Sequence, residues 1–249
     1  MVQPQNTLIG LLQPALRRQL LARCEPVRLV PAQILCHTLL PLSHAYFPVH
    51  GAVTLAIEVD DQPALQVGMI GREGMLGCEW MIGLQVMPWR LVSQGEGSGW
   101  RIDSESFLGF VAKFPALEAV CRRYLMVRLQ QLSRAAACQR FHPLGPRLAC
   151  WLLMSQDRAH ANAFPVTQVV LALLLGVRRV GITQAANTLR QQGLSAYHRG
   201  TLTILTRQAL EQLACSCHAA DLGTYERLMR ATDTGTGSGR QPGSARLPH

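Results

Sequence analysis

Four side chains between residues 178 and 190 have the chemistry to bind the edges of base pairs: Arg178, Arg179, Gln184 and Arg190. A guanidinium can donate two parallel hydrogen bonds to guanine, and a glutamine amide can pair with adenine. All four fall within one predicted helix, at about 178–192, that contains no acidic residue. This pattern is typical of a helix that reads the major groove of DNA.

The residues before this helix predict the element that would position it. Thr167 can cap a helix beginning at Gln168, and Gly176 can take the left-handed conformation that turns the chain sharply. The expected inward-facing residues recur at helical spacing: Leu171, Ala172, Leu175, Ile182, Ala185, Ala186 and Leu189. Helix, glycine turn and helix together predict a helix-turn-helix. The alternative is an ordinary helical hairpin that contacts no nucleic acid.

Two short β-prone runs follow, at 194–197 and 202–205, around a turn that contains Gly200. They predict a basic hairpin, or wing, that could hold His198 or Arg199 near phosphate. The predicted DNA-binding residues are Thr167, Arg178, Arg179, Thr183, Gln184, Arg190, His198 and Arg199.

The charge of the chain is concentrated in the same region. The 249 residues carry a formal net charge of +9, and residues 139–210 hold eight Arg and a single acid, Asp157. Residues 1–110 hold seven Arg and nine acids. A basic segment joined to a near-neutral one indicates a nucleic-acid-binding domain. A solvated basic face without a partner is the alternative.

The first half of the chain predicts a sensor-like β domain. One helix is expected over residues 7–24. Short β-prone runs then alternate with Gly, Pro and Asp turns up to Asp103, which favours a β-sandwich or β-roll. A long helix is expected from Pro115 to about Cys138. Its spacing predicts a dimerisation seam or, alternatively, an internal core stripe. The seam residues are Leu125, Leu129, Leu132 and Ala136.

Thr167 to Thr183, with Leu175-Gly176-Val177-Arg178-Arg179 at its centre, resembles the winged helix-turn-helix of the CRP/FNR family of bacterial regulators. Residues 46–51 and 70–77 are similar to that family's β-roll. The resemblance spans residues 10–215 and implies an α+β fold: an N-terminal double-stranded β-helix (β-roll or jelly-roll) sensor, a long dimerisation helix and a C-terminal winged helix-turn-helix. The expected domains are 1–112, 113–140 and 141–230, with a disordered tail at 231–249. The resemblance implies that Arg179 contacts a base.

Cyclic-nucleotide binders of this family hold the ribose with Glu and the phosphate with an Arg-Ser pair. The effector pocket is expected at Gly77, Cys78, Glu79 and Arg90, where Cys78 replaces the Glu and Pro88-Trp89 lies near the Arg-Ser position. Pro and Trp cannot neutralise a phosphate as Arg does. We therefore expect that cyclic AMP is not bound in the usual way, and the effector is unknown.

No metal site is predicted. Cys215-Ser216-Cys217-His218 is the one tight Cys/His group in the sequence, and zinc sites usually need further nearby ligands. No cofactor is evident. The eight cysteines show no disulfide framework and no secretory signal is visible, which predicts reduced thiols in a soluble cytoplasmic protein without membrane contact.

The sequence contains no nucleophile–base triad, phosphate-binding glycine loop or paired carboxylates, so an enzyme is not expected. The expected function is a transcription regulator that binds a palindromic operator in double-stranded DNA as a homodimer. RNA polymerase is a further candidate partner. The alternative is a ligand-binding signalling module whose helix-turn-helix is degenerate and has no specific DNA output.

Overall fold

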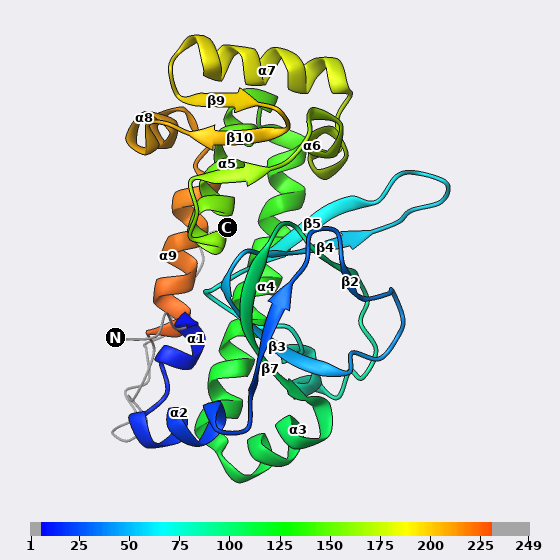
Figure 1. Ribbon diagram of the computed structural model, residues 1–249, viewed down its shortest axis with the longest axis vertical. Helices are drawn as coiled ribbons and strands as arrows, with labels where there is room; N and C mark the ends of the chain where they lie inside the picture. Colours follow the sequence, from blue (N-terminus) through cyan, green and yellow to red (C-terminus); the bar gives the residue numbers. More distant parts are fainter. Residues whose placement is uncertain (1–5, 231–249) are drawn as a thin grey trace, which may run out of the picture.

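Seven strands form the region predicted to be the sensor, as two antiparallel sheets (Figure 1). Their bounds are β1 Glu25–Leu29, β2 Ile34–Cys36, β3 His44–His50, β4 Val53–Ile57, β5 Leu65–Ile70, β6 Arg90–Ser93 and β7 Gly97–Asp103. One sheet has the order β1-β7-β3 and the other β2-β6-β4-β5. Side chains of both sheets, such as Phe47 and Leu55, are buried in one core. The computed structural model, which describes residues 6–230, thus confirms the β-roll and the α+β class.

The single helix expected over residues 7–24 is wrong. The chain instead forms α1 (Thr7–Gly10) and α2 (Pro14–Leu21). Proline lacks the backbone N–H of a helix interior and its ring clashes with the preceding turn, so Pro14 begins a new helix instead of continuing the first. Leu8 and Leu20 are nevertheless both buried in the sensor core.

Two helices lead out of the β-roll. Asp103 caps α3 (Ser104–Lys113) by accepting a hydrogen bond of 2.8 Å from the Ser106 amide. The long helix α4 (Pro115–Phe141) has 27 residues and begins with a proline in its first turn. It ends three residues beyond the predicted Cys138 and runs along the β-roll through the middle of the molecule (Figure 1).

The C-terminal region has its own apolar core and a small sheet of order β8-β10-β9. Its elements are α5 Leu144–Ala159, β8 Ala163–Pro165, α6 Gln168–Leu175, α7 Arg179–Gln191, β9 Ser195–His198, β10 Thr201–Ile204, α8 Arg207–Leu213 and α9 Cys217–Met229. The last helix, α9, returns along α4, and its Met229 is buried in the sensor core. The predicted tail at 231–249 lies outside the described residues.

The two cores meet where α5 packs against the glycine-rich segment after β5. Arg158 of α5 donates to the Met69 carbonyl at 3.0 Å and pairs with Glu73 at 3.4 Å. A Cβ atom on Gly71 would lie 2.4 Å from the Arg158 carbonyl oxygen. Glycine at this position is therefore required by the close approach of the two domains.

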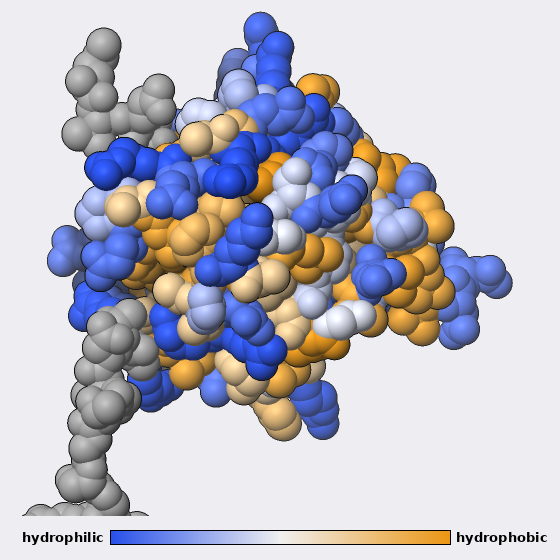
Figure 2. All heavy atoms as spheres, turned by 90° about the horizontal axis from the view of Figure 1, so that it is seen from below, coloured by the Kyte–Doolittle hydropathy of each residue, from blue (hydrophilic) through white to orange (hydrophobic). Residues whose placement is uncertain are grey.

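Across residues 6–230, no single helix is both long and apolar enough to cross a membrane; only α6 and α7 counted together, with a 110° bend between them, meet the criteria of length and composition. The end of the molecule opposite α7 presents apolar and hydrophilic side chains intermixed (Figure 2).

Candidate nucleic-acid interface

The predicted helix-turn-helix is present as α6 and α7. The Thr167 hydroxyl accepts a hydrogen bond of 3.2 Å from the Val170 amide and so caps α6. Gly176 ends this helix at φ +63°. The chain bends by 110° between α6 and α7. That angle lies in the range of DNA-binding helix-turn-helix motifs. Leu171, Ala172, Leu175, Ile182, Ala186 and Leu189 are buried as predicted, and Ala185 is half-buried.

Helix α7 lies at one end of the molecule with its outer face open (Figure 1). Arg178 is its N-cap, without a capping hydrogen bond from its side chain. Arg178, Arg179, Gln184 and Arg190 are exposed. The predicted base-contacting residues therefore share one free helix.

Thr183, for which a DNA contact is predicted, also makes a hydrogen bond within the motif. Its hydroxyl donates to the Gln168 side-chain oxygen at 2.8 Å, which joins α7 to the start of α6. Thr183 is therefore a residue that positions the two helices. Thr167 is likewise engaged as a cap.

Sequence reasoning missed Val180. It is 68% exposed and directly follows Arg179 in the first turn of α7. An exposed apolar residue there has no packing role, but it can contact the methyl group of thymine. An apolar residue off the inward-facing stripe of the helix was the signal that could have found it.

The predicted wing is formed by β9 and β10. Its turn consists of Arg199 (φ +46°) and Gly200 (φ +81°), and two positive φ angles are the mark of a type I′ hairpin. His198 and Arg199 are exposed at this turn. The Tyr197 hydroxyl donates to the Val166 carbonyl at 3.1 Å and anchors the hairpin to the segment before α6.

Asp157, the single acid between residues 139 and 210, belongs to α5 and is neutralised there. Its carboxylate binds Arg207 and His218, each at 2.7 Å. Burial alone would raise the pKa of Asp157, but the hydrogen bonds from His218 and Arg207 outweigh it, and the pKa is lowered. No carboxylate of this segment therefore opposes the positive charges of α7 and the wing.

Two residues of the expected effector pocket, Glu79 and Arg90, are each ion-paired with another side chain of the protein. Cys78 and Glu79 lie in the short 3₁₀ helix η1 (Cys78–Ile82), and Glu79 is ion-paired with Arg128 of α4. The side chains of Glu79 and Arg128 are only 2% and 4% exposed. Arg90 instead pairs with Glu58 at 2.8 Å on the second sheet.

Two further observations show how this site is filled. The Trp89 ring covers the Arg128 guanidinium, with 4.8 Å between the guanidinium carbon and the ring centroid. Burial raises the pKa of the Cys78 thiol to about 12, so the thiol is protonated and unreactive at neutral pH. Arg128 of this chain's own long helix thus pairs with one carboxylate oxygen of Glu79 inside the β-roll.

Only part of the predicted dimer seam is free. Leu129 is 55% exposed and Ala136 is exposed. Leu125 packs on the sensor core, and Leu132 lies 3.8 Å from the position of a Cβ on Gly68 of β5. Leu125 and Leu132 therefore face their own chain, because the β-roll covers one side of α4. Met126, which was not predicted, is exposed beside Leu129.

With this geometry in place, comparison with known proteins assigns the C-terminal region. Residues 146–213 match the model of the Crp-like helix-turn-helix domain. The chain carries a Crp-like helix-turn-helix. The Crp-like domain includes α6, α7 and the wing, together with nearly all of α5 and the whole of α8. No curated protein matches the chain.

Several solved structures share the fold of the Crp-like domain and the β-roll together. The c-di-GMP responsive global regulator CLP of Xanthomonas campestris is 18% identical over 78% of this chain and 100% of its own, with a TM-score of 0.61. FixK2 from Bradyrhizobium japonicum is 15% identical over 77% and 98%, with a TM-score of 0.64. A CRP/FNR-family transcriptional regulator from Thermus thermophilus is 20% identical over 76% and 98%, with a TM-score of 0.56. The expected CRP/FNR resemblance is thus confirmed in fold.

Proposed function

We propose that the chain is a sequence-specific transcription regulator that binds a palindromic operator as a homodimer. The observation that carries this proposal is α7: an exposed helix without acids that presents Arg178, Arg179 and Gln184 beside a basic wing. Such residues at the start of a recognition helix meet base edges, and a wing meets phosphate. The Crp-like domain and the CRP/FNR fold support this proposal.

The homodimer would form along α4. Met126 and Leu129 are large apolar residues that remain exposed on this helix, and Ala136 follows two turns later. Burying such a stripe against a second copy removes apolar surface from water. Two copies of α7 would then enter successive major-groove turns, about 34–36 Å apart.

The β-roll would sense an effector other than cyclic AMP bound in the usual mode. The support is the buried Glu79–Arg128 pair under Trp89, because Arg128 occupies the partner position of the acid. A ligand of that site would have to displace a desolvated ion pair, which is costly.

Replacing Arg179 by Ala tests the DNA-binding proposal. Wild-type protein first selects a duplex from a random pool, and anisotropy titration then compares the variants on that duplex. Arg179→Ala should lose about 1–3 kcal/mol of specific affinity and relax preference at one base position in each half-site. Alanine keeps the helix, since the Thr183 contact at this residue involves its backbone carbonyl.

Arg227→Ala is the matched control, because it removes the same charge from an exposed residue of α9, remote from α7 (Figure 1). It should leave specificity unchanged. If the chain were a signalling module without DNA output, Arg179→Ala and Arg227→Ala would have the same affinity and base preference on the selected duplex. That result would contradict the proposal.

A further inference from the structure

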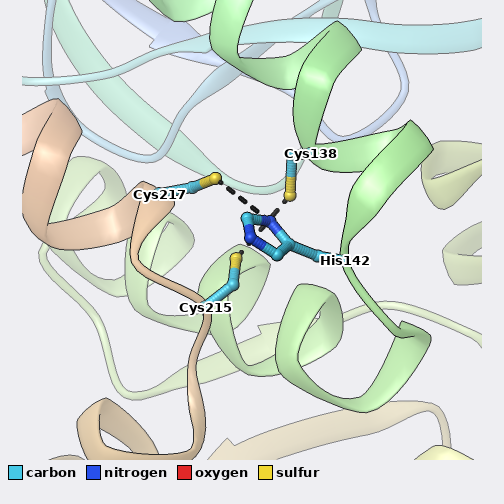
Figure 3. A group of neighbouring side chains, drawn as sticks. All are labelled: Cys138, His142, Cys215 and Cys217. Carbon is cyan, nitrogen blue, oxygen red and sulfur yellow. Dashed lines mark hydrogen bonds between the residues drawn. The ribbon is translucent and has the colours of Figure 1, made fainter.

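Four side chains of the kinds that bind zinc converge where α4 gives way to α5. Cys138 and His142 come from the end of α4, and Cys215 and Cys217 flank the start of α9. Their ligand atoms all lie within 4.8 Å of one another. The three sulfur atoms are directed toward the His142 ring (Figure 3). The pair Cys138 and His142 lies more than 70 residues before the pair Cys215 and Cys217 in the sequence. The sequence pattern around Cys215 therefore contains only two of the four residues.

Two distances within the group, one between each pair of facing ligands, match the edges of a tetrahedral zinc site. The Cys138 and Cys215 sulfurs are 3.6 Å apart, and the Cys217 sulfur is 3.5 Å from His142 Nδ1. A tetrahedral zinc with Zn–S of about 2.3 Å and Zn–N of about 2.0–2.1 Å has ligand–ligand edges of about 3.5–3.8 Å. An iron–sulfur cluster holds its cysteines further apart, because several irons and sulfides lie between them.

The surrounding protein holds the four ligands together without help from an ion. One turn before Cys138, Arg134 of α4 binds Asp221 of α9 at 2.8 Å. The Cys215 amide donates to the Pro146 carbonyl at 3.3 Å, at the start of α5. Three elements therefore fix the group from different sides, which is the preorganisation that a structural metal site needs.

Simple packing of thiols accounts less well for this arrangement. Cys24, Cys36, Cys78 and Cys121 lie in or beside the sensor core, as small apolar residues do, and within residues 6–230 none of them belongs to a cluster of metal-ligating side chains. Around α9, by contrast, three sulfurs share one imidazole, and Cys217 and His142 are in direct contact through polar atoms. Cys150 also lies beside Cys215 but outside the mutually close group.

We propose that Cys138, His142, Cys215 and Cys217 bind one Zn²⁺ ion that ties α9 to the end of α4. The thiols give their protons to solvent on binding, and no redox change is involved. Closed coordination by four protein ligands makes this a structural site. The ion fixes the point at which the chain leaves the long helix and enters the Crp-like domain.

Metal analysis of the full-length protein, purified under reducing conditions and reconstituted with Zn²⁺, tests the proposal. Wild type should hold about one Zn²⁺ per chain. Substitution with Co²⁺ should give intense visible bands of tetrahedral geometry and a thiolate charge-transfer band, a readout that needs no variant. Absence of both, acid-labile sulfide with iron, or a metal-free Cys138–Cys215 disulfide would overturn the proposal.

The variants Cys217→Ser and His142→Ala assign the ligands, with Cys150→Ser and Cys24→Ser as controls that remove a neighbouring and a remote thiol. Loss of an outer-shell partner costs about 10–100-fold in metal affinity, so loss of a ligand should exceed that. The controls should keep stoichiometric zinc. Zinc retained by folded Cys217→Ser, or lost from Cys150→Ser alone, would contradict the ligand set.

Discussion

Arg128 extends from α4 into the interior of the β-roll, where it is the charged partner of Glu79. It is buried between the Glu79 carboxylate and the Trp89 ring. Although burial alone would lower the pKa of Arg128, Glu79 raises it above the ordinary value, and the residue stays charged. The ion pair between Arg128 and Glu79 thus joins the long helix α4 to the β-roll.

Removing one partner of this pair should be strongly destabilising. Arg128→Met leaves Glu79 buried without a counter-charge and should lower the free energy of unfolding by about 3–5 kcal/mol, measured by urea denaturation. The double variant Arg128→Met with Glu79→Gln is the control and should recover much of the loss. Equal stability of the single variant and wild type would show that the pair is not buried as described.

Calorimetry of wild type should detect no cyclic AMP binding.

Sequence reasoning at the residue scale succeeded where a local pattern determines the environment. Thr167, Gly176 and the exposed arginines of α7 follow from helix signals within 25 residues. It failed where distant segments meet. Nothing near Glu79 announces Arg128, which is 49 residues away, and nothing near Cys215 announces His142.

At the scale of elements, the contact between α5 and the segment after β5 joins the β-roll to the Crp-like domain. Glu73 in this segment contacts three helices: Arg158 of α5, the Tyr124 hydroxyl of α4 at 3.4 Å and, through its carbonyl, the Tyr225 hydroxyl of α9 at 2.7 Å. Glu73 therefore holds α4, α5 and α9 at one point beside the β-roll.

Gly71→Ala should break this contact. The new Cβ would meet the Arg158 backbone oxygen at 2.4 Å, which no rotamer change relieves, so α5 must move away from the β-roll. We expect a loss of about 1–3 kcal/mol in thermal or urea unfolding, as for overpacking. Hydrogen exchange should increase in α5 and in the 70–77 segment.

Gly109→Ala is the matched control for this substitution. It adds the same methyl group within α3, where a Cβ meets nothing within 4 Å, and should stabilise by up to about 1 kcal/mol. If both variants behave alike, the close approach at Gly71 is not a stability determinant.

Element boundaries were predictable where turn chemistry is explicit. The wing and the start of α4 at Pro115 lie within a few residues of their predicted bounds. The prediction of one helix over residues 7–24 was wrong because the apolar periodicity continues across Pro14, where the helical backbone is interrupted. β2 has three residues, too few to show a periodic pattern.

At the scale of the molecule, the proposed function requires two copies of the chain and one DNA duplex. The positive segment, the exposed α7 and the wing lie at one end, and the free apolar residues Met126 and Leu129 lie along α4. Half of the predicted seam, Leu125 and Leu132, faces the β-roll. The spacing of the leucines predicts the helix, but it does not indicate which side of that helix the β-roll of the same chain covers.

The most direct test of the central claim is selection of bound sequences from a random duplex pool, at near-physiological salt, with and without extract of cells that carry the gene. A homodimer that reads DNA through α7 should select a two-fold symmetric site with half-sites about one helical turn apart, at 34–36 Å. Leu129→Glu, which places a charge on the free face of α4, should lose this symmetric site. Salt-sensitive binding with no consensus under either condition would contradict the account.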